Sequence, residues 1–171
     1  SIVIDNEGML YVSSERDRDI SKNINIGQIT KLNPYLNDPV VWTVSVDDDL
    51  PKERQRGIWA TPAFYKNFLY VQSTGGQFMV LDTKDGEMTW RTILPAHSWS
   101  SPLVVNDQLI VTRCDGVISF YDLADPAHPN FLKNVKISSS CIESTPAVWN
   151  GRLYVGSRDG YFYATGPDVT H

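Results

Sequence analysis

A segment of about forty residues recurs along this chain of 171 residues, and it limits the fold more than any other feature. The prolines near the start of three copies are 40 and 44 residues apart, and the glycines of their second turn keep the same two spacings. These landmarks are Pro62, Pro102 and Pro146, and Gly76, Gly116 and Gly160. A more divergent copy begins at Ile2 and carries an insertion, Glu15 to Ile26. The chain is therefore a row of four units of one kind.

Each unit predicts short strands joined by tight turns. A Ser-Pro or Thr-Pro pair opens the first strand, where proline is tolerated because the first residue need not donate to the ladder. Asn106-Asp107 and Asn150-Gly151 suit the first hairpin because these residues accept positive φ. Asp115-Gly116 suits the second. Four-stranded units at this period indicate an all-β β-propeller with four blades of antiparallel sheet, at about residues 1–44, 58–92, 98–134 and 142–171.

Composition narrows the class of partner. The hydrophobic fraction of 42% is that of a globular domain. The net charge of −5 argues against nucleic acid, because phosphate binding needs a basic face. No run of about eighteen apolar residues occurs, so no membrane span is expected. The chain opens on an apolar strand instead of a signal peptide, which favours a mature product or an excised piece.

The repeat resembles a known family. The run from Thr83 to Trp90, Thr-Lys-Asp-Gly-Glu-Met-Thr-Trp, is similar to the repeat of pyrroloquinoline-quinone-like (PQQ-like) propellers. Such proteins include quinoprotein dehydrogenases and non-catalytic scaffolds of the BamB type, and they close about seven or eight blades into a ring. The resemblance implies a partial ring, the C-terminal half of a larger propeller. The missing half, or a second copy of the chain, would then cover the exposed end blades.

The repeat also locates the mouth of the central channel, where propellers bind ligands. The segments that enter the innermost strands and the turns of the second hairpins line that mouth. The candidate binding residues there are Trp59, His97, Trp99, Arg113, Glu143 and Arg158. This mixture of aromatic and charged side chains suits recognition of a ligand or partner. Packing between blades is the alternative role for Trp59 and Trp99, and Trp42 and Trp90 are expected to be structural wedges.

The two cysteines, Cys114 and Cys141, fall on this same face in adjoining units. A disulfide between them would suit an exported protein. Free, buried thiols are the alternative, because cysteine often behaves as a small hydrophobe.

Metal and cofactor signals are absent from the sequence. A dehydrogenase of this family would show an adjacent Cys-Cys pair against the quinone and ligands for calcium, and no such pair occurs. The acidic run Asp47 to Asp49 is expected to be a solvated loop between blades one and two. The three histidines, His97, His128 and His171, lack metal-ligand spacing. We therefore predict no catalytic residue, no metal and no bound cofactor.

Two functional interpretations follow. The first is a non-catalytic propeller that serves as a protein-interaction scaffold or ligand-binding module, in cell-envelope assembly. The second is a fragment of a PQQ-dependent quinoprotein dehydrogenase, whose quinone and calcium ligands would lie in missing blades. The family resemblance places either protein in the periplasm or at the cell surface.

Overall fold

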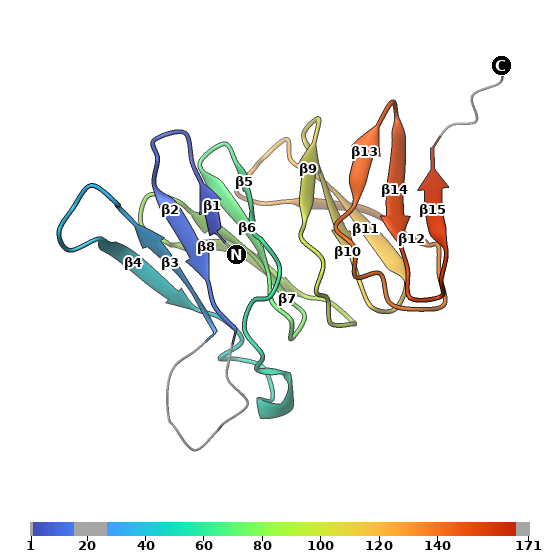
Figure 1. Ribbon diagram of the computed structural model, residues 1–171, viewed down its shortest axis with the longest axis horizontal. Coiled ribbons are helices and arrows are strands. Elements are labelled where there is room, and N and C mark those ends of the chain that lie inside the picture. Colours follow the sequence, from blue (N-terminus) through green and yellow to red (C-terminus); the bar gives the residue numbers. More distant parts are fainter. Residues whose placement is uncertain (1, 16–26, 167–171) are drawn as a thin grey trace.

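The structure, a computed structural model, describes residues 2–15 and 27–166. Residues 16–26, which make up most of the predicted insertion, and His171 lie outside the described residues. Figure 1 shows four sheets standing side by side in chain order, from blue to red. This arrangement is the predicted row of propeller blades, which confirms the all-β fold and the partial ring.

The first three blades are four-stranded antiparallel sheets, and each follows the order of the chain. Blade 1 contains β1 (Ile2–Ile4), β2 (Leu10–Ser13), β3 (Gln28–Leu32) and β4 (Val40–Ser45). Blade 2 contains β5 (Ala63–Tyr65), β6 (Phe68–Gln72), β7 (Gln77–Asp82) and β8 (Met88–Ile93). Blade 3 contains β9 (Leu103–Val105), β10 (Gln108–Thr112), β11 (Val117–Asp122) and β12 (Asn130–Lys136).

Blade 4 has three strands in the described part of the chain: β13 (Ala147–Trp149), β14 (Arg152–Gly156) and β15 (Phe162–Thr165). The outer edge of β15 therefore has no neighbouring strand among the described residues. A short 3-10 helix, η2 (Lys52–Arg54), lies in the segment that connects blades 1 and 2. Among the described residues, no helix has the length and apolar character needed to cross a membrane.

The first hairpins of blades 2, 3 and 4 are built alike. Each has a two-residue loop, with Tyr65 opposite Phe68 in blade 2 and the equivalent pairs in the others. Both loop residues have positive φ in all three cases, as at Asn150 (49°) and Gly151 (73°). This is the turn whose twist matches that of paired strands, so the Asn-rich loops specify the hairpins locally.

The core lies between the blades. Alternate residues of a strand point to opposite faces of its sheet, so β6 contributes to two interfaces. Leu69 and Val71 pack with Tyr11 of blade 1, whereas Tyr70 packs with Leu109 of blade 3. A third cluster joins blades 3 and 4. Stacking of neighbours is thus the main source of stability, as expected for a repeat protein.

The tryptophans of the outer strands lie at these interfaces, as predicted. Trp42 donates its indole N–H to the carbonyl oxygen of Thr83 in blade 2 (3.2 Å). A Cβ atom at Gly86 would lie 2.9 Å from the Trp42 ring, so only glycine leaves room for this contact. Trp90 packs edge-on against Tyr121 of blade 3, with 5.9 Å between ring centroids.

Candidate functional site

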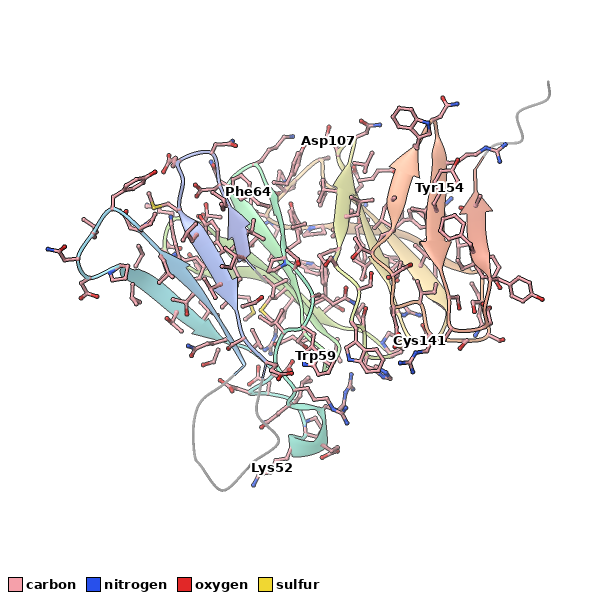
Figure 2. All side chains as sticks on the ribbon, in the orientation of Figure 1. Lys52, Trp59, Phe64, Asp107, Cys141 and Tyr154 are labelled. Carbon is pink, nitrogen blue, oxygen red and sulfur yellow. A yellow bond between two sulfur atoms is a disulfide. The ribbon has the colours of Figure 1, made fainter. Side chains whose placement is uncertain are left out.

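The predicted channel-mouth residues gather at one end of the blades. Figure 2 shows Trp59 and Cys141 at this end and Asp107, in a first hairpin, at the other. One backbone hydrogen bond recurs in blades 2, 3 and 4. In each blade a residue of the second hairpin donates its N–H to a carbonyl oxygen of the segment that leads into the first strand of that blade. Its pairs are Thr74 to Gly57 (2.8 Å), Cys114 to His97 (3.0 Å) and Arg158 to Cys141 (2.9 Å). The backbone at this end therefore has the same conformation in the three blades, and the blades differ there in their side chains.

An aromatic pair occupies the face between blades 2 and 3. Trp59 and Trp99 are stacked, with 6.0 Å between ring centroids and 26° between planes. His97 meets Trp99 edge-on at 5.0 Å. Trp59 is 50% exposed, although large apolar side chains normally avoid water. The two indoles thus pack on each other, and Trp59 still presents a surface to solvent.

Charged side chains from blade 4 complete the surface. The guanidinium carbon of Arg158 lies 5.2 Å from the Trp99 ring centroid, within the range of a cation–π contact. The same guanidinium forms a salt bridge with Glu143, with 2.8 Å between Nε and Oε1. We call Trp59, His97, Trp99, Glu143 and Arg158 the aromatic platform. Stacking and ion pairing hold its members in place.

Arg113, the remaining sequence candidate, is used inside its own blade. Its side chain is 6% exposed and forms a salt bridge with Asp115 (2.8 Å). It also donates to Ser119 Oγ (3.0 Å). Burial alone would raise the pKa of Asp115, but the hydrogen bonds and charge of Arg113 outweigh it and lower that pKa. These partners give Arg113 a structural role and leave it little surface for a ligand.

Cys114 and Cys141 form a disulfide between the second hairpin of blade 3 and the segment that enters blade 4. Their sulfur atoms and a carboxylate oxygen of Glu143 lie within 4.8 Å of one another, an arrangement that thiolates would need for a metal ion. Sulfurs joined to each other are not thiolates. The pairing instead fastens the last blade to its neighbour.

Asp47 corrects one prediction. The acidic run was expected to be a solvated loop, and Asp48 and Asp49 are exposed, but Asp47 is only 1% exposed. Its carboxylate accepts the backbone N–H groups of Arg56 (3.1 Å) and Gly57 (3.0 Å). Burial raises its pKa, and these hydrogen bonds act in the opposite direction. These bonds close the connecting segment on itself, and the Asp47 N–H donates to Gln77 Oε1 of blade 2 (2.9 Å), which is a tertiary contact that charge patterning does not predict.

The same segment carries residues that the sequence analysis treated only as a mixed-charge linker. Arg54 donates Nε to the carbonyl oxygen of Gly75 (2.9 Å) and Nη2 to that of Leu94 (3.3 Å). It therefore lies against the second hairpin of blade 2, beside the aromatic platform. One sequence feature could have indicated that this turn differs from the others. Gly75 stands at the repeat position where the later copies have Asp115 and Asp159.

Comparison with known proteins settles the family. The family described as "Outer membrane protein assembly factor BamB" matches residues 26–128, more than half of the chain. The chain belongs to the BamB family. Relatives of that name from Shewanella oneidensis and Yersinia pestis are each 22% identical to it over 67% and 68% of the chain. These matches cover 29% and 28% of the two relatives, so the chain spans less than a third of their length.

Solved structures show the same architecture. BamB from Moraxella catarrhalis superposes with a TM-score of 0.73 at 17% identity, over 97% of this chain and 45% of that one. A computationally designed protein, Ika4, superposes with a TM-score of 0.69 at 12% identity, over 97% of this chain and 91% of that one. At such identities the likeness concerns the fold alone. The BamB fold accordingly extends well beyond the four blades of this chain.

Proposed function

We propose that this chain is a non-catalytic propeller segment that binds a protein partner through the aromatic platform during outer-membrane protein assembly. The observation that carries the proposal is the stacked and half-exposed pair of Trp59 and Trp99, with Arg158 against the Trp99 ring. Tryptophan and arginine are the side chains that most often dominate the energy of a protein interface. Membership of the BamB family supports the process in which the partner takes part.

The platform is organised in advance. Trp59 rests on Trp99, and the salt bridge with Glu143 restrains Arg158. A partner would therefore lose little side-chain entropy from this surface on binding, which favours affinity. The buried indole N–H of Trp99 has no hydrogen-bond acceptor among the described residues. A small shift of the ring in a complex would let it donate to a partner.

The proposed location is the periplasm or the cell surface. The Cys114–Cys141 disulfide supports it, since disulfides persist in oxidising compartments such as the bacterial periplasm. The names of the relatives point to the outer membrane as well.

Site-specific photocrosslinking tests the proposal in the complete protein inside its bacterial host. A photoreactive phenylalanine analogue replaces Trp59 in one variant and Asn106, in an exposed first hairpin at the opposite end, in the other. We expect position 59 to capture a component of the outer-membrane assembly machinery and position 106 not to. Capture at both positions to the same extent, or at neither, would refute a partner site on this face.

A further inference from the structure

A notch lies at the place in the repeat where a second hairpin faces the segment entering the next blade. Between blades 3 and 4 the Cys114–Cys141 disulfide fills it. Between blades 2 and 3 the equivalent residues are Thr74 and His97, and the space is a cavity of about 440 Å³. Its walls include Glu53, Arg54, Arg56, Thr74, Gly75 and His97. We call this cavity the blade 2–3 notch.

Two guanidinium groups in the notch donate hydrogen bonds only to neutral carbonyl oxygens in the described part of the chain. Arg54 donates to the carbonyl oxygens of Gly75 and Leu94, and Arg56 donates Nε to that of Glu53 (3.2 Å). Neither forms a salt bridge with a carboxylate within residues 2–15 and 27–166. An arginine offers five N–H donors in a fixed planar fork. Both side chains therefore retain donors and charge for a bound group.

Thr74 provides an independent observation. Its side chain is 2% exposed, and its hydroxyl oxygen is buried without a hydrogen-bond partner in the described part of the chain. A buried polar group left unpaired is destabilising because it has lost its hydrogen bonds to water. Because Thr74 lines the notch, a ligand that accepts its O–H would relieve this cost.

The repeat shows that the notch departs from its equivalents. In blade 3 the residue after Cys114 is Asp115, whose carboxylate pairs with Arg113. In blade 2 that place is Gly75, and the nearest carboxylate there comes from the connecting segment, since Asp47 Oδ2 would lie 3.0 Å from a Cβ atom at Gly75. A Cβ atom at Gly75 would lie 2.1 Å from the backbone oxygen of Arg54, and one at Gly76 would lie 2.6 Å from Arg54 Nη2. The glycine pair thus makes room for Arg54 where other blades place a carboxylate.

The charge balance indicates which anion fits. Arg54 and Arg56 bring two positive charges to the notch and Glu53 one negative charge, and the Asp47 carboxylate, 3.0 Å from where a Cβ atom at Gly75 would lie, adds a second negative charge beside it. Asp47 interacts electrostatically with Arg54, and its carboxylate accepts N–H groups of the connecting segment. A single carboxylate brings one negative charge to the donors of this site, whereas a phosphate dianion would place two in a half-buried cavity.

We propose that the blade 2–3 notch binds one carboxylate of an acidic segment in the partner protein. The carboxylate accepts N–H groups from Arg54 and Arg56 and the O–H of Thr74. His97 lines the notch and contacts Trp99, so a segment lying on the aromatic platform reaches the notch directly. The inference rests on the proposed partner-binding function for the origin of the carboxylate, and the notch itself is tested with small probes.

The test is a titration of the isotope-labelled chain, followed by amide NMR signals. The probe is glutamate capped as N-acetyl methylamide, and the matched neutral probe is capped glutamine. We expect capped glutamate to shift the signals of Thr74, Gly75 and His97 saturably, and capped glutamine to leave them in place. Equal responses to both probes, or no saturable response, would overturn the proposal. Saturation by inorganic phosphate without saturation by capped glutamate would overturn it also.

Two variants connect the signals to the notch. Thr74→Val removes the hydroxyl and keeps the shape, so it should lower the affinity for capped glutamate about fivefold to tenfold without destabilising the fold. Arg56→Gln should lower that affinity by a similar factor. Unchanged affinity in both variants would contradict the assignment. Trp59→Ala should leave the affinity for capped glutamate unchanged, because Trp59 does not line the notch. The carboxylate-binding proposal can therefore fail or succeed independently of the partner-binding proposal.

Discussion

The disulfide between Cys114 and Cys141 ties the second hairpin of blade 3 to the segment that enters blade 4. Blade 4 has a neighbour on one side only in the described chain, and it has three strands where the others have four. It therefore buries less than any inner blade. A covalent link is most useful at such a terminal unit, whose stability depends on a single interface.

Replacing both cysteines with serine should loosen blade 4 selectively. The bridged residues are 27 positions apart, and closing a loop of this length stabilises by about 3.5 kcal/mol in the chain-entropy account. Amide exchange in β14 should therefore become up to roughly 300-fold faster, while exchange in β6 and β7 stays unchanged. Reduction of the unaltered protein should reproduce the effect. Equal acceleration in all blades, or none, would contradict this role.

The tryptophans should separate into structural and binding residues. Trp90 packs against Phe78 and Tyr121 at the interface of blades 2 and 3, so Trp90→Ala should lower the free energy of unfolding by about 2–4 kcal/mol. Trp59 is half exposed, and Trp59→Ala should lower it by less than about 1 kcal/mol. Urea denaturation measures both. Similar losses in the two variants would show that Trp59 is a packing residue.

The Arg113–Asp115 pair should make stability depend on pH. The pKa of Asp115 is lower in the folded protein than its ordinary value of 3.8, so the pair stabilises the fold above that value. This contribution is lost as the pH falls through the lowered pKa. Asp115→Asn should reduce the free energy of unfolding by about 2 kcal/mol at pH 7, because it leaves Arg113 buried without its charge partner.

The control for that prediction is the same comparison at low pH. Below the lowered pKa the native Asp115 is protonated as well, so the difference between variant and native protein should shrink. A difference that stays constant from pH 7 to that range would contradict an ionic contribution.

The 171-residue chain should pair with itself when produced alone. Val3 and Tyr163 pack into the core, so their neighbours in β1 and β15 face outward at the two ends of the row. Ile4 there is 63% exposed and Phe162 73%. Apolar sheet faces of this kind associate in water. We expect a solution mass near twice 19.3 kDa, since a second copy can cover both ends.

Phe162→Glu should shift that pair toward the monomer, because it places a charge in the contact. Lys84→Glu, which changes charge at an exposed outer turn, should leave the pair intact. A native chain that is monomeric at all concentrations would refute self-association through the end blades.

Features encoded within one repeat were predictable from the sequence. The turns at Asn106-Asp107 and Asn150-Gly151 follow from local preferences for positive φ, and the repeat spacing then defines the blades. The end of the blades at which Trp59 and Trp99 lie followed from the same register. Neither inference needed knowledge of contacts between distant segments.

Features that depend on packing between segments were not predictable. Asp47 lies in an acidic run that is typical of a solvated loop, yet it is buried by the fold of the connecting segment on blade 2. The repeat position of Arg113 predicted a ligand-binding side chain at the surface, but Asp115 and Ser119 hold its side chain inside blade 3. The blade 2–3 notch could not be predicted because it depends on the contact between Arg54 and Gly75, which are 21 residues apart. In each case the partner that decides the role comes from tertiary contact.

The most direct test of the account is the affinity of the complete protein for the component captured through position 59. Trp59→Ala is compared with Tyr35→Ala, which removes another exposed aromatic side chain from the outer turn between β3 and β4. The account predicts at least a tenfold loss for Trp59→Ala, about 1.4 kcal/mol, and no loss for Tyr35→Ala. Equal affinity of the Trp59→Ala variant and the native protein would contradict it.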